Sequence, residues 1–504
     1  MSSPQTPSTT NPLTQNPARS TRRFSLSRFD KTVLLVSVIL VAFIGLTILL
    51  GDRVGVTLDR VGPLGLARST EPILIQFSET MNRDSLPAHL RVVEIKPGTQ
   101  PENFQESDTI ASVAGDIHWN GKTLLFQPKS ALQPGAFYAV ILDKGVVSDT
   151  GRAVLAEYRY GFEVRHPRVA YLAPATGTPY NIWIADPTDL SSAKQITFSP
   201  SGIFNYSVSP DGSKIAFAER NTNTGTSDIK LLDLDTNALQ QLTNCQDADC
   251  TTPVWRPDGQ VIGYERVELN STFTQVGVSP TRIWLLDLTS TPPSTRPLFS
   301  DSQMLGYGLQ WSDDGNRITV FDYNSQGILF HQFNPDSTIV IPSRYGSAGW
   351  LSPDGTRVIY PEVLLQTSEA RSYLQLVDLK TQQIKALTSP DDPIDDDTAA
   401  WSPDGKMLAI GRRYLDDRFT RGKQLYLMNP EDSSVQAVLV DPQYQIGSFV
   451  WDPNGTQLLL QRFPDPVAMG DPNNPGKPEV WTVDVTTKAL TKIADDAFLP
   501  RWVP

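Results

Sequence analysis

The longest apolar run of the chain lies near its start. No charged residue occurs from Thr32 to Leu50, and a helix of this length, rising about 1.5 Å per residue, would span about 28 Å. That span is close to the hydrocarbon thickness of a bilayer, about 30 Å. We therefore expect one transmembrane helix over residues 32–50. A cleaved signal peptide is the alternative, but the residues around Leu50 lack the small-residue pattern of a cleavage site.

The charges that flank this run predict its orientation. Residues 1–31 are rich in Ser, Thr, Pro, Gln and Asn, so we expect a disordered tail that cannot bury a core. Basic residues dominate just before the helix, whereas the charges just after it cancel. The positive-inside rule then predicts a single-pass protein of the cell membrane, with a cytoplasmic N-terminus and an extracytoplasmic bulk. The basic residues are Arg19, Arg22, Arg23, Arg28 and Lys31.

After an expected linker over residues 51–67, residues 68–166 alternate between apolar and polar positions in short segments. Each segment mixes β-branched or aromatic residues with polar ones and is bounded by Gly, Pro, Asn or Asp, which is typical of strands. About one hundred residues of such strands predict a β-sandwich. The expected strands are Ile73–Phe77, Leu90–Val93, Thr109–Val113, Thr123–Pro128, Ala136–Leu142 and Glu157–Val164.

This region resembles the SbsA-type bacterial Ig-like domains. The resemblance rests on Ile75–Met81, on Trp119–Leu124 with Phe126 and Pro128, and on Leu132–Tyr138 followed by Ser148–Gly151. It implies an Ig-like spacer or adhesive module without catalytic residues. We expect Met81 and Trp119 to pack in its core.

Residues 168–504 contain one motif six times. The motif is an aromatic or apolar residue, then Ser-Pro-Asp-Gly or a close variant, then an apolar strand. Its glycines recur every 40 to 56 residues, a period typical of propeller blades. The six copies are Tyr206–Gly212, Trp255–Gly259, Trp311–Gly315, Leu351–Gly355, Trp401–Gly405 and Trp451–Gly455.

The chemistry of a tight turn explains this motif. Pro fixes φ at the second position, Asp accepts local backbone hydrogen bonds, and Gly adopts the left-handed conformation. We therefore expect the aspartates of these turns to be structural, and the Trp before each turn to fill the space between successive blades.

The two ends of the region complete each other. Residues 168–199 supply the second, third and fourth strands of a blade, and Leu499–Pro504 supply a first strand without a blade. The expected fold class is all-β: a seven-bladed β-propeller over residues 168–504, closed by the C-terminal strand and preceded by an Ig-like β-sandwich and a single transmembrane helix. Closure would remove exposed sheet edges.

The repeat resembles the TolB-type propeller repeat, which implies an interaction platform. TolB is usually described with six blades, which differs from the seven expected here.

The two faces of such a propeller differ in their connections. Short repeated turns lie on one face, together with both chain ends, and long dissimilar loops lie on the other. Because variable loops on a rigid scaffold commonly carry binding, we expect the long-loop face to point outward and to bind. The long connections are Arg266–Pro280, Glu362–Arg371, Arg412–Arg421, Phe463–Pro478, Asn244–Thr252 and Ser389–Thr398.

Two charged clusters fall in these loops. The acidic one could hold Ca²⁺ through carboxylate oxygens, although it lacks the spacing and central Gly of a calcium loop; a solvated acidic loop is the alternative. The second cluster, which combines arginines and aspartates, could bind an anionic peptide or glycan. Salt bridges between its own members are the alternative. The first comprises Asp391, Asp392, Asp395, Asp396 and Asp397, and the second Arg412, Arg413, Asp416, Asp417, Arg418 and Arg421.

Cys245 and Cys250 are the two cysteines of the chain. Outside the membrane they can oxidise, so we expect a local disulfide. Two thiolates without a neighbouring His would make a poor zinc site.

Composition bears on the expected partners, metal sites and cofactors. The chain has 43 Lys and Arg against 55 Asp and Glu, a net charge of −12, which disfavours nucleic acid as a partner. It has 4 His, without the spacing of a histidine metal site. No cofactor is expected beyond a loop-bound Ca²⁺.

The leading hypothesis is a non-enzymatic, membrane-anchored scaffold that presents its propeller to a cell-envelope protein, peptide or glycan. The alternative is a carbohydrate-active or other propeller enzyme that uses loop carboxylates, for example Asp416 with Glu362. No G-x-S-x-G elbow of a serine hydrolase occurs. A signal-transducing receptor would need a partner, because the cytoplasmic tail is short.

Overall fold

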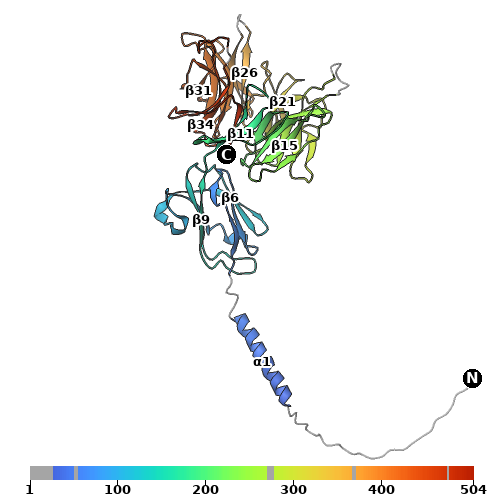
Figure 1. Cartoon of the computed structure of the whole chain (residues 1–504), viewed down its shortest axis with the longest axis vertical. Coiled ribbons are helices and arrows are strands. Elements are labelled where there is room, and N and C mark those ends of the chain that lie inside the picture. The colour runs from blue at the N-terminus through green and yellow to red at the C-terminus, as the bar shows by residue number, and fades with distance from the viewer. Residues whose placement is uncertain (1–26, 50–54, 270–276, 366–369, 474–475) are drawn as a thin grey trace, which may run out of the picture.

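The computed structural model describes residues 27–49, 55–269, 277–365, 370–473 and 476–504. A helix, an Ig-like domain and a propeller region follow one another along the chain (Figure 1). The helix α1 (Arg28–Leu49) is long and apolar enough, by length and composition, to cross a membrane or to act as a signal sequence. The expected disordered tail lies mostly outside the described residues.

The Ig-like domain consists of two sheets packed around one core. The four-stranded sheet has the order β1-β3-β7-β6 and the five-stranded sheet the order β2-β9-β8-β4-β5. Met81 is 1% exposed, and Trp119 stacks on Phe77 in the same core. The strands are β1 Leu58–Gly62, β2 Gly65–Ala67, β3 Ile73–Phe77, β4 Leu90–Ile95, β5 Thr109–Ser112, β6 Gly115–Asn120, β7 Thr123–Pro128, β8 Phe137–Leu142 and β9 Tyr158–Val164; the 3₁₀ turns are η1 Arg83–Ser85, η2 Pro101–Asn103 and η3 Glu106–Asp108.

The domain begins earlier than residue 68. Strands β1 and β2 lie in residues that the sequence pattern assigns to a linker. β1 pairs with β3, whereas β2 runs parallel to β9, almost one hundred residues later. The partner of β2 is too distant in sequence to leave a local signal. β1 is an edge strand, and its exposed charged residues, such as Asp59, give it the sequence pattern of a linker.

The propeller region forms, among the described residues, seven four-stranded antiparallel sheets. In each sheet the first and the fourth strand form the two edges. The sheets are β37-β10-β11-β12 (Phe498–Val503, Arg168–Ala173, Asn181–Asp186, Asp189–Gln195), β13–β16 (Ile203–Val208, Lys214–Arg220, Ser227–Asp233, Leu239–Gln241), β17–β20 (Ala248–Trp255, Val261–Glu268, Arg282–Asp287, Ser294–Pro297), β21–β24 (Gly306–Trp311, Arg317–Asp322, Gly327–Gln332, Ser337–Pro342), β25–β28 (Trp350–Leu351, Arg357–Leu364, Arg371–Asp378, Gln383–Ala386), β29–β32 (Ile394–Trp401, Leu408–Tyr414, Gln424–Met428, Val435–Leu439) and β33–β36 (Tyr444–Trp451, Gln457–Pro464, Glu479–Asp484, Leu490–Asp495).

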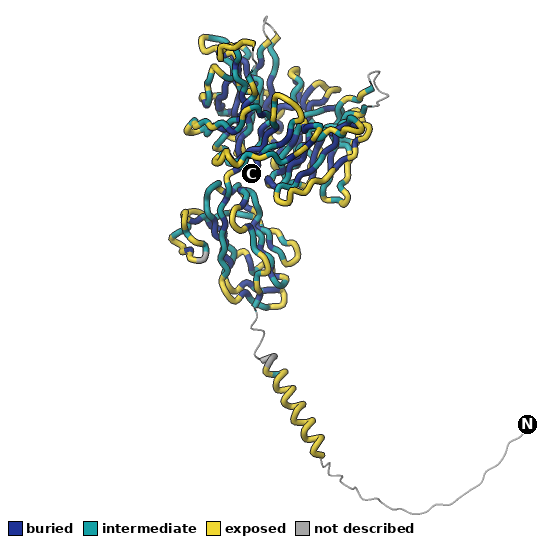
Figure 2. Tube along the Cα trace, in the orientation of Figure 1, coloured by how far each residue is buried: buried dark blue, intermediate teal, exposed yellow. Residues whose placement is uncertain are grey.

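The last strand belongs to the first sheet. β37 pairs antiparallel with β10, and Val503 lies opposite Arg168. Each sheet contacts the next along the chain, and the seventh contacts the first through β34 and β37. One apolar cluster fills each of these interfaces. Figure 2 shows the buried segments of the chain, to which these residues belong.

Tryptophan side chains link the first strands of neighbouring sheets. The indole N–H of four of them donates to a backbone oxygen of the preceding sheet, which satisfies the one polar atom of a buried ring. These bonds run from Trp255 to Ser207 (3.3 Å), from Trp401 to Trp350 (3.0 Å), from Trp451 to Ala400 (3.1 Å) and from Trp502 to Val450 (3.2 Å).

The repeated turns have the structure that their residues predict. In the turn after β13, the Asp211 carboxylate accepts from the Ser209 hydroxyl (2.6 Å) and from the Ser213 backbone N–H (3.0 Å). Gly212 has φ +67°, where a side chain would be strained and would meet Pro504. The turn aspartates are therefore structural acceptors.

Replacing Trp502 by Ala should destabilise the propeller region by about 3–5 kcal/mol, because a buried indole and its hydrogen bond between the seventh and first sheets are lost. The measurement is guanidinium unfolding of the full chain in detergent, followed by circular dichroism. Leu190→Ala, at a 42% exposed position of the same sheet, serves as the control. Equal shifts for the two variants would contradict the role of Trp502.

Candidate functional site

The Ig-like domain contacts one face of the propeller region. Successive strands of each sheet of the propeller region run antiparallel. The connections between first and second strands, and between third and fourth strands, therefore lie on the same face, which we call the short-turn face. Arg68 of the Ig-like domain binds both carboxylate oxygens of Asp235 on this face (3.2 and 3.1 Å), and Arg165 donates to the Pro504 backbone oxygen (2.8 Å). The C-terminus accordingly lies at the junction of the two domains (Figure 1).

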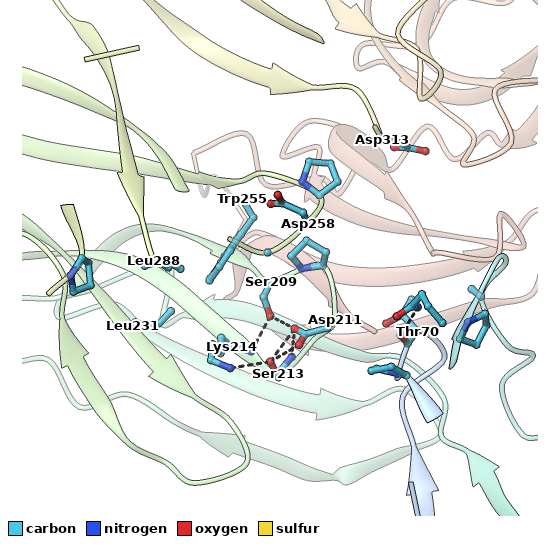
Figure 3. Close-up of a pocket in the computed structure, with 18 of the residues that line it drawn as sticks. Thr70, Ser209, Asp211, Ser213, Lys214, Leu231, Trp255, Asp258, Leu288 and Asp313 are labelled. Atoms are coloured by element: carbon cyan, nitrogen blue, oxygen red, sulfur yellow. Dashed lines mark hydrogen bonds between the residues drawn. The ribbon is translucent and has the colours of Figure 1, made fainter. Parts of the chain in front are cut away.

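A cleft of about 1100 Å³ lies between the two domains. One wall is the Ig-like segment 127–131 with Thr70 and Pro72, and the other is formed by turns of the second and third sheets together with Asp313 of the fourth (Figure 3). Clefts between domains are common ligand sites. The sequence pattern gave no signal for this one, because it depends on how two separately folded domains meet.

The cleft carries both acceptors and donors; its hydroxyl groups are those of Thr70, Ser130, Ser209, Ser213, Ser290 and Thr291. Five prolines line it and bring carbonyl oxygens without N–H donors, and three carboxylates join them. Its two lysines are paired outside the cleft, Lys129 with Asp116 (3.3 Å) and Lys214 with Asp233 (3.6 Å). The prolines are Pro72, Pro128, Pro210, Pro257 and Pro293, and the carboxylates are Asp211, Asp258 and Asp313.

The opposite face, which carries the remaining connections and which we call the long-loop face, holds the residues that the sequence singles out. Its central feature is a buried ion pair: Arg412 on β30 binds both oxygens of Asp396 on β29, at 2.8 Å from Nη2 and 2.9 Å from Nε. Their side chains are 7% and 0% exposed. Desolvation raises the pKa of Asp396. Desolvation alone would lower the pKa of Arg412, but the hydrogen bonds to Asp396 outweigh it, and the Arg412 pKa is raised.

A second set of charges surrounds this pair. Arg413 binds Asp395 (2.9 Å), and Lys423 lies 3.5 Å from Asp395 and also pairs with Asp397. The Tyr345 hydroxyl donates to Asp397 (3.2 Å), and burial together with the Asp397 charge raises the Tyr345 pKa to about 12.

The part of the acidic cluster that contains Asp395 and Asp396 is therefore not a solvated loop, whereas Asp391 and Asp392 are exposed. Asp395 and Asp396 lie in strand β29, directly opposite Arg413 and Arg412 in the pairing with β30. Cross-strand neighbours of opposite charge neutralise each other. Among the described residues no group of three or more His, Cys, Asp or Glu could hold a metal ion. Asp391 and Asp392 lie in the loop before β29, apart from these pairs.

The remaining residues of the mixed cluster lie at the surface. Arg418 pairs with Asp416 and stacks on the ring of Tyr414 at 3.6 Å. Arg421 lies 3.4 Å from Asp465 on the neighbouring loop of the seventh sheet. Asp417 is exposed. The four arginines of the cluster thus each have a carboxylate partner, which leaves little unneutralised positive charge for an anionic ligand.

The sequence pattern missed the exposed apolar residues of the long-loop face. Phe419, Val467 and Met469 are 56%, 47% and 43% exposed on two adjacent loops, which the Arg421–Asp465 pair joins. We call these three residues the apolar patch. Other large exposed apolar side chains lie on the same face: Phe198, Phe204, Tyr323, Tyr345, Leu365 and Val440.

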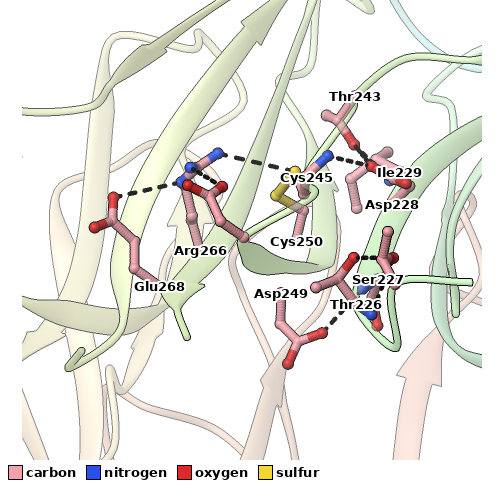
Figure 4. Close-up of a disulfide and its surroundings, with 12 residues drawn as sticks. Thr226, Ser227, Asp228, Ile229, Thr243, Cys245, Asp249, Cys250, Arg266 and Glu268 are labelled. Atoms are coloured by element: carbon pink, nitrogen blue, oxygen red, sulfur yellow. Dashed lines mark hydrogen bonds and ion pairs between the residues drawn. A yellow bond between two sulfur atoms is a disulfide. The ribbon is translucent and has the colours of Figure 1, made fainter. Parts of the chain in front are cut away.

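Cys245 and Cys250 form a disulfide at the long-loop end of the third sheet (Figure 4). Both cysteines are buried. The Asp228 carboxylate accepts from the Cys245 backbone N–H (2.7 Å) and from the Thr243 hydroxyl (3.0 Å). Arg266 lies beside the sulfur and stacks on Trp284 at 5.0 Å. The disulfide thus fixes the connection into β17.

Comparison with known proteins identifies the first domain. Residues 55–164 match the family described as bacterial Ig-like domain. This agrees with the resemblance to Ig-like domains and with the presence of β1 in the fold. No curated protein matches the chain in sequence.

Several solved structures, a TolB protein among them, are similar to this chain over about two thirds of its length. Oligogalacturonate lyase from Vibrio parahaemolyticus is 16% identical, with 65% of this chain and 86% of that chain covered and a TM-score of 0.44. TolB from Acinetobacter baumannii is 20% identical, with 67% and 82% covered and a TM-score of 0.36. A structure from an analysis of two prolyl endopeptidases is 13% identical, with 66% and 50% covered and a TM-score of 0.46. These likenesses concern the fold alone.

The expectation that the protein is not an enzyme is corrected by these neighbours. An oligogalacturonate lyase and prolyl peptidases are enzymes on a similar fold. Catalysis is therefore compatible with the architecture, and the fold gives no ground for excluding it.

Replacing Arg412 by Met should destabilise the propeller region by about 3–5 kcal/mol, because Asp396 would keep a buried charge without a partner. Replacing Asp396 by Leu in the same chain should recover most of this loss, since no charge is then buried. Chemical unfolding of the three proteins measures the difference. Arg418→Met, in the exposed pair with Asp416, is the control and should change stability little; a single-variant loss no larger than that of the control would contradict the prediction.

Replacing Cys245 and Cys250 together by Ala should lower the free energy of unfolding by about 2 kcal/mol, because the disulfide closes a short loop in the unfolded chain. Unfolding with and without a reducing agent is the measurement. Reduction should lower the stability of the natural chain and leave the variant unchanged. Free thiols in peptide mapping of the unreduced protein would contradict the disulfide.

Proposed function

We propose that this protein is a membrane-anchored, extracytoplasmic binding protein. In this proposal α1 spans the membrane with the N-terminus in the cytoplasm. The Ig-like domain carries a seven-bladed propeller, closed by β37, and the long-loop face binds a protein of the cell envelope. The positive charges before the helix support the orientation.

The apolar clusters between sheets support a single ring. Each described sheet shares a buried cluster with the next, and the cluster of Val169, Tyr171, Leu459, Val480 and Trp502 joins the seventh sheet to the first. A ring of rigid sheets holds its loops in fixed positions, which favours a binding surface.

The observation that carries the proposal is the distribution of exposed apolar side chains. On the propeller region, those of the described residues that are large and exposed lie on the long-loop face or on outer strands, as Leu190 and Leu239 do. Among the described residues no connection of the short-turn face carries one, and those at its edge, such as Leu239, lie on fourth strands. Water disfavours such surface, so a concentration of it on one face marks an interaction site.

The charges around the patch fit a protein partner. Arg418 with Asp416, and Arg421 with Asp465, form paired charges beside Phe419 and Met469. An apolar centre with a polar rim is the common anatomy of protein interfaces. The Ig-like domain contacts the opposite face, so the long-loop face is free to receive a partner.

Replacing Phe419 and Met469 by Ser should abolish capture of the partner, because the centre of the interface would lose its apolar contacts. The full chain is expressed in its host with a photo-crosslinking amino acid at Asp417, and the cross-linked protein is identified by mass spectrometry. The expected result is one defined partner, lost in the double variant.

The matched control carries Leu190→Ser and Leu239→Ser on outer strands, where exposure is similar. This variant should keep the partner. Loss of the partner in both variants, or its retention in both, would overturn the assignment of the long-loop face.

A further inference from the structure

Trp311 departs from the pattern by which tryptophans link neighbouring sheets. Five tryptophans occupy the same position of their first strands, and four of them donate the indole N–H to the preceding sheet. The indole N–H of Trp311 is buried and has no acceptor among the described residues. Its ring stacks instead on Phe333 of the same sheet, with 5.9 Å between the ring centroids. The interface between the third and fourth sheets therefore lacks this hydrogen bond.

A second departure from the repeat lies at the other end of the same interface. The seventh residue after the glycine of the motif is charged in all six copies, and among the described residues four of these side chains have an oppositely charged partner. In the fourth sheet this residue is Asp322, which is 5% exposed and forms no ion pair within the described part of the chain. Its Oδ2 accepts from the Ser325 backbone N–H (2.8 Å), whereas its Oδ1 is buried without a donor. The four pairs are Glu219–Lys230, Arg266–Asp247, Arg412–Asp396 and Arg462–Asp441.

Asp322 faces the third sheet. It lines a hollow of about 10 Å³ together with Ile283 and Leu298 of the third sheet and Val320 and Leu329 of the fourth. Apolar walls supply no hydrogen-bond donor. The Asp322 carboxylate has therefore lost hydration on this side without a compensating contact.

Both departures lower the free energy needed to separate these two sheets. A buried donor or acceptor without a partner is less favourable than a hydrated one, and separation would let water reach the Trp311 N–H and the Asp322 Oδ1. At the interfaces where the Trp N–H is bonded, separation would instead break that bond. Local opening occurs first where the native contacts are least favourable.

The two ends of the interface differ in how they are held. Near the long-loop end of β21, the Gly306 N–H donates to the Thr281 oxygen (2.9 Å) and the Gly308 N–H to the Glu265 carboxylate (3.0 Å). These bonds lie beside residues 298–305, which connect the two sheets. The long-loop end therefore stays joined, and the short-turn end, where Trp311 lies, is the one that can separate.

We propose that the propeller region opens between its third and fourth sheets, with residues 298–305 as the hinge, while the interfaces that bonded tryptophans link stay closed. Asp258 of the third sheet and Asp313 of the fourth line the same cleft beside the Ig-like domain. The opening therefore widens this cleft. It is a property of the propeller region itself and does not need a partner on the long-loop face.

The test measures how often each interface opens, by the reaction of a buried thiol with a maleimide. The two natural cysteines form a disulfide, so an introduced thiol is labelled selectively in the full chain in detergent. Val320→Cys reports on the third and fourth sheets, Val483→Cys on the sixth and seventh, and Val480→Cys on the seventh and first; these valines are 4%, 0% and 0% exposed. Under native conditions the Val320→Cys protein should be labelled at least tenfold faster than the other two.

Two matched tryptophan variants should act in opposite directions. Trp311→Phe keeps an aromatic ring and removes the unpaired N–H, so it should slow labelling of the Val320→Cys protein about tenfold. Trp451→Phe removes a bonded N–H and should speed labelling of the Val483→Cys protein by a similar factor. The inference is overturned if the three thiols are labelled at equal rates, or if both Phe variants speed labelling.

A pair of Asp variants tests the buried charge. Asp322→Asn removes the charge and should slow labelling of the Val320→Cys protein. The control is Asp301→Asn on the exposed connection before β21, where the carboxylate also accepts a backbone N–H, from Gln303 (2.8 Å). This control should leave the labelling rate unchanged, and equal effects of the two Asn variants would contradict the role of Asp322.

Discussion

The pairing of the last strand with the first decides how this molecule is arranged. β37 lies beside β10, so residues 168 and 504 meet at one end of the same sheet. The Ig-like domain ends only three residues before β10, and it must therefore contact the face on which both chain ends lie. Arg165 accordingly reaches the Pro504 oxygen, and Arg68 reaches Asp235. A cleft on the short-turn face and a free long-loop face both follow from this one pairing.

Most of the fold could be predicted because its signals are local. A Ser-Pro-Asp-Gly turn needs hydrogen bonds within five residues, and these form as the residue types require, for example between Ser209, Asp211 and Ser213. The Trp before a turn marks an interface between sheets because few buried sites accept a ring of that size. The strands that sequence reasoning missed, β1 and β2, owe their place to partners elsewhere in the chain. Their own residues carry no strong preference.

The candidate sites were harder to predict because they depend on register and on domain contact. Asp396 and Arg412 are sixteen residues apart, and only the pairing of β29 with β30 places them opposite each other and buries them. A shift of one residue would turn these side chains to the other side of the sheet. The charge pattern therefore predicted a cluster at the right place, but not that its members neutralise one another. The apolar patch gave no periodic signal, since Phe419 and Met469 lie in irregular loops.

Charged side chains of both domains meet at their junction. The Arg68–Asp235 pair has an acid that is 62% exposed, so it adds little to stability. Arg165 and Arg168 lie close to Arg68, and burial together with these neighbouring positive charges lowers the Arg165 pKa to about 10. The junction thus gathers three arginines beside the connection through Pro167, and the Pro504 oxygen accepts a hydrogen bond from one of them, Arg165.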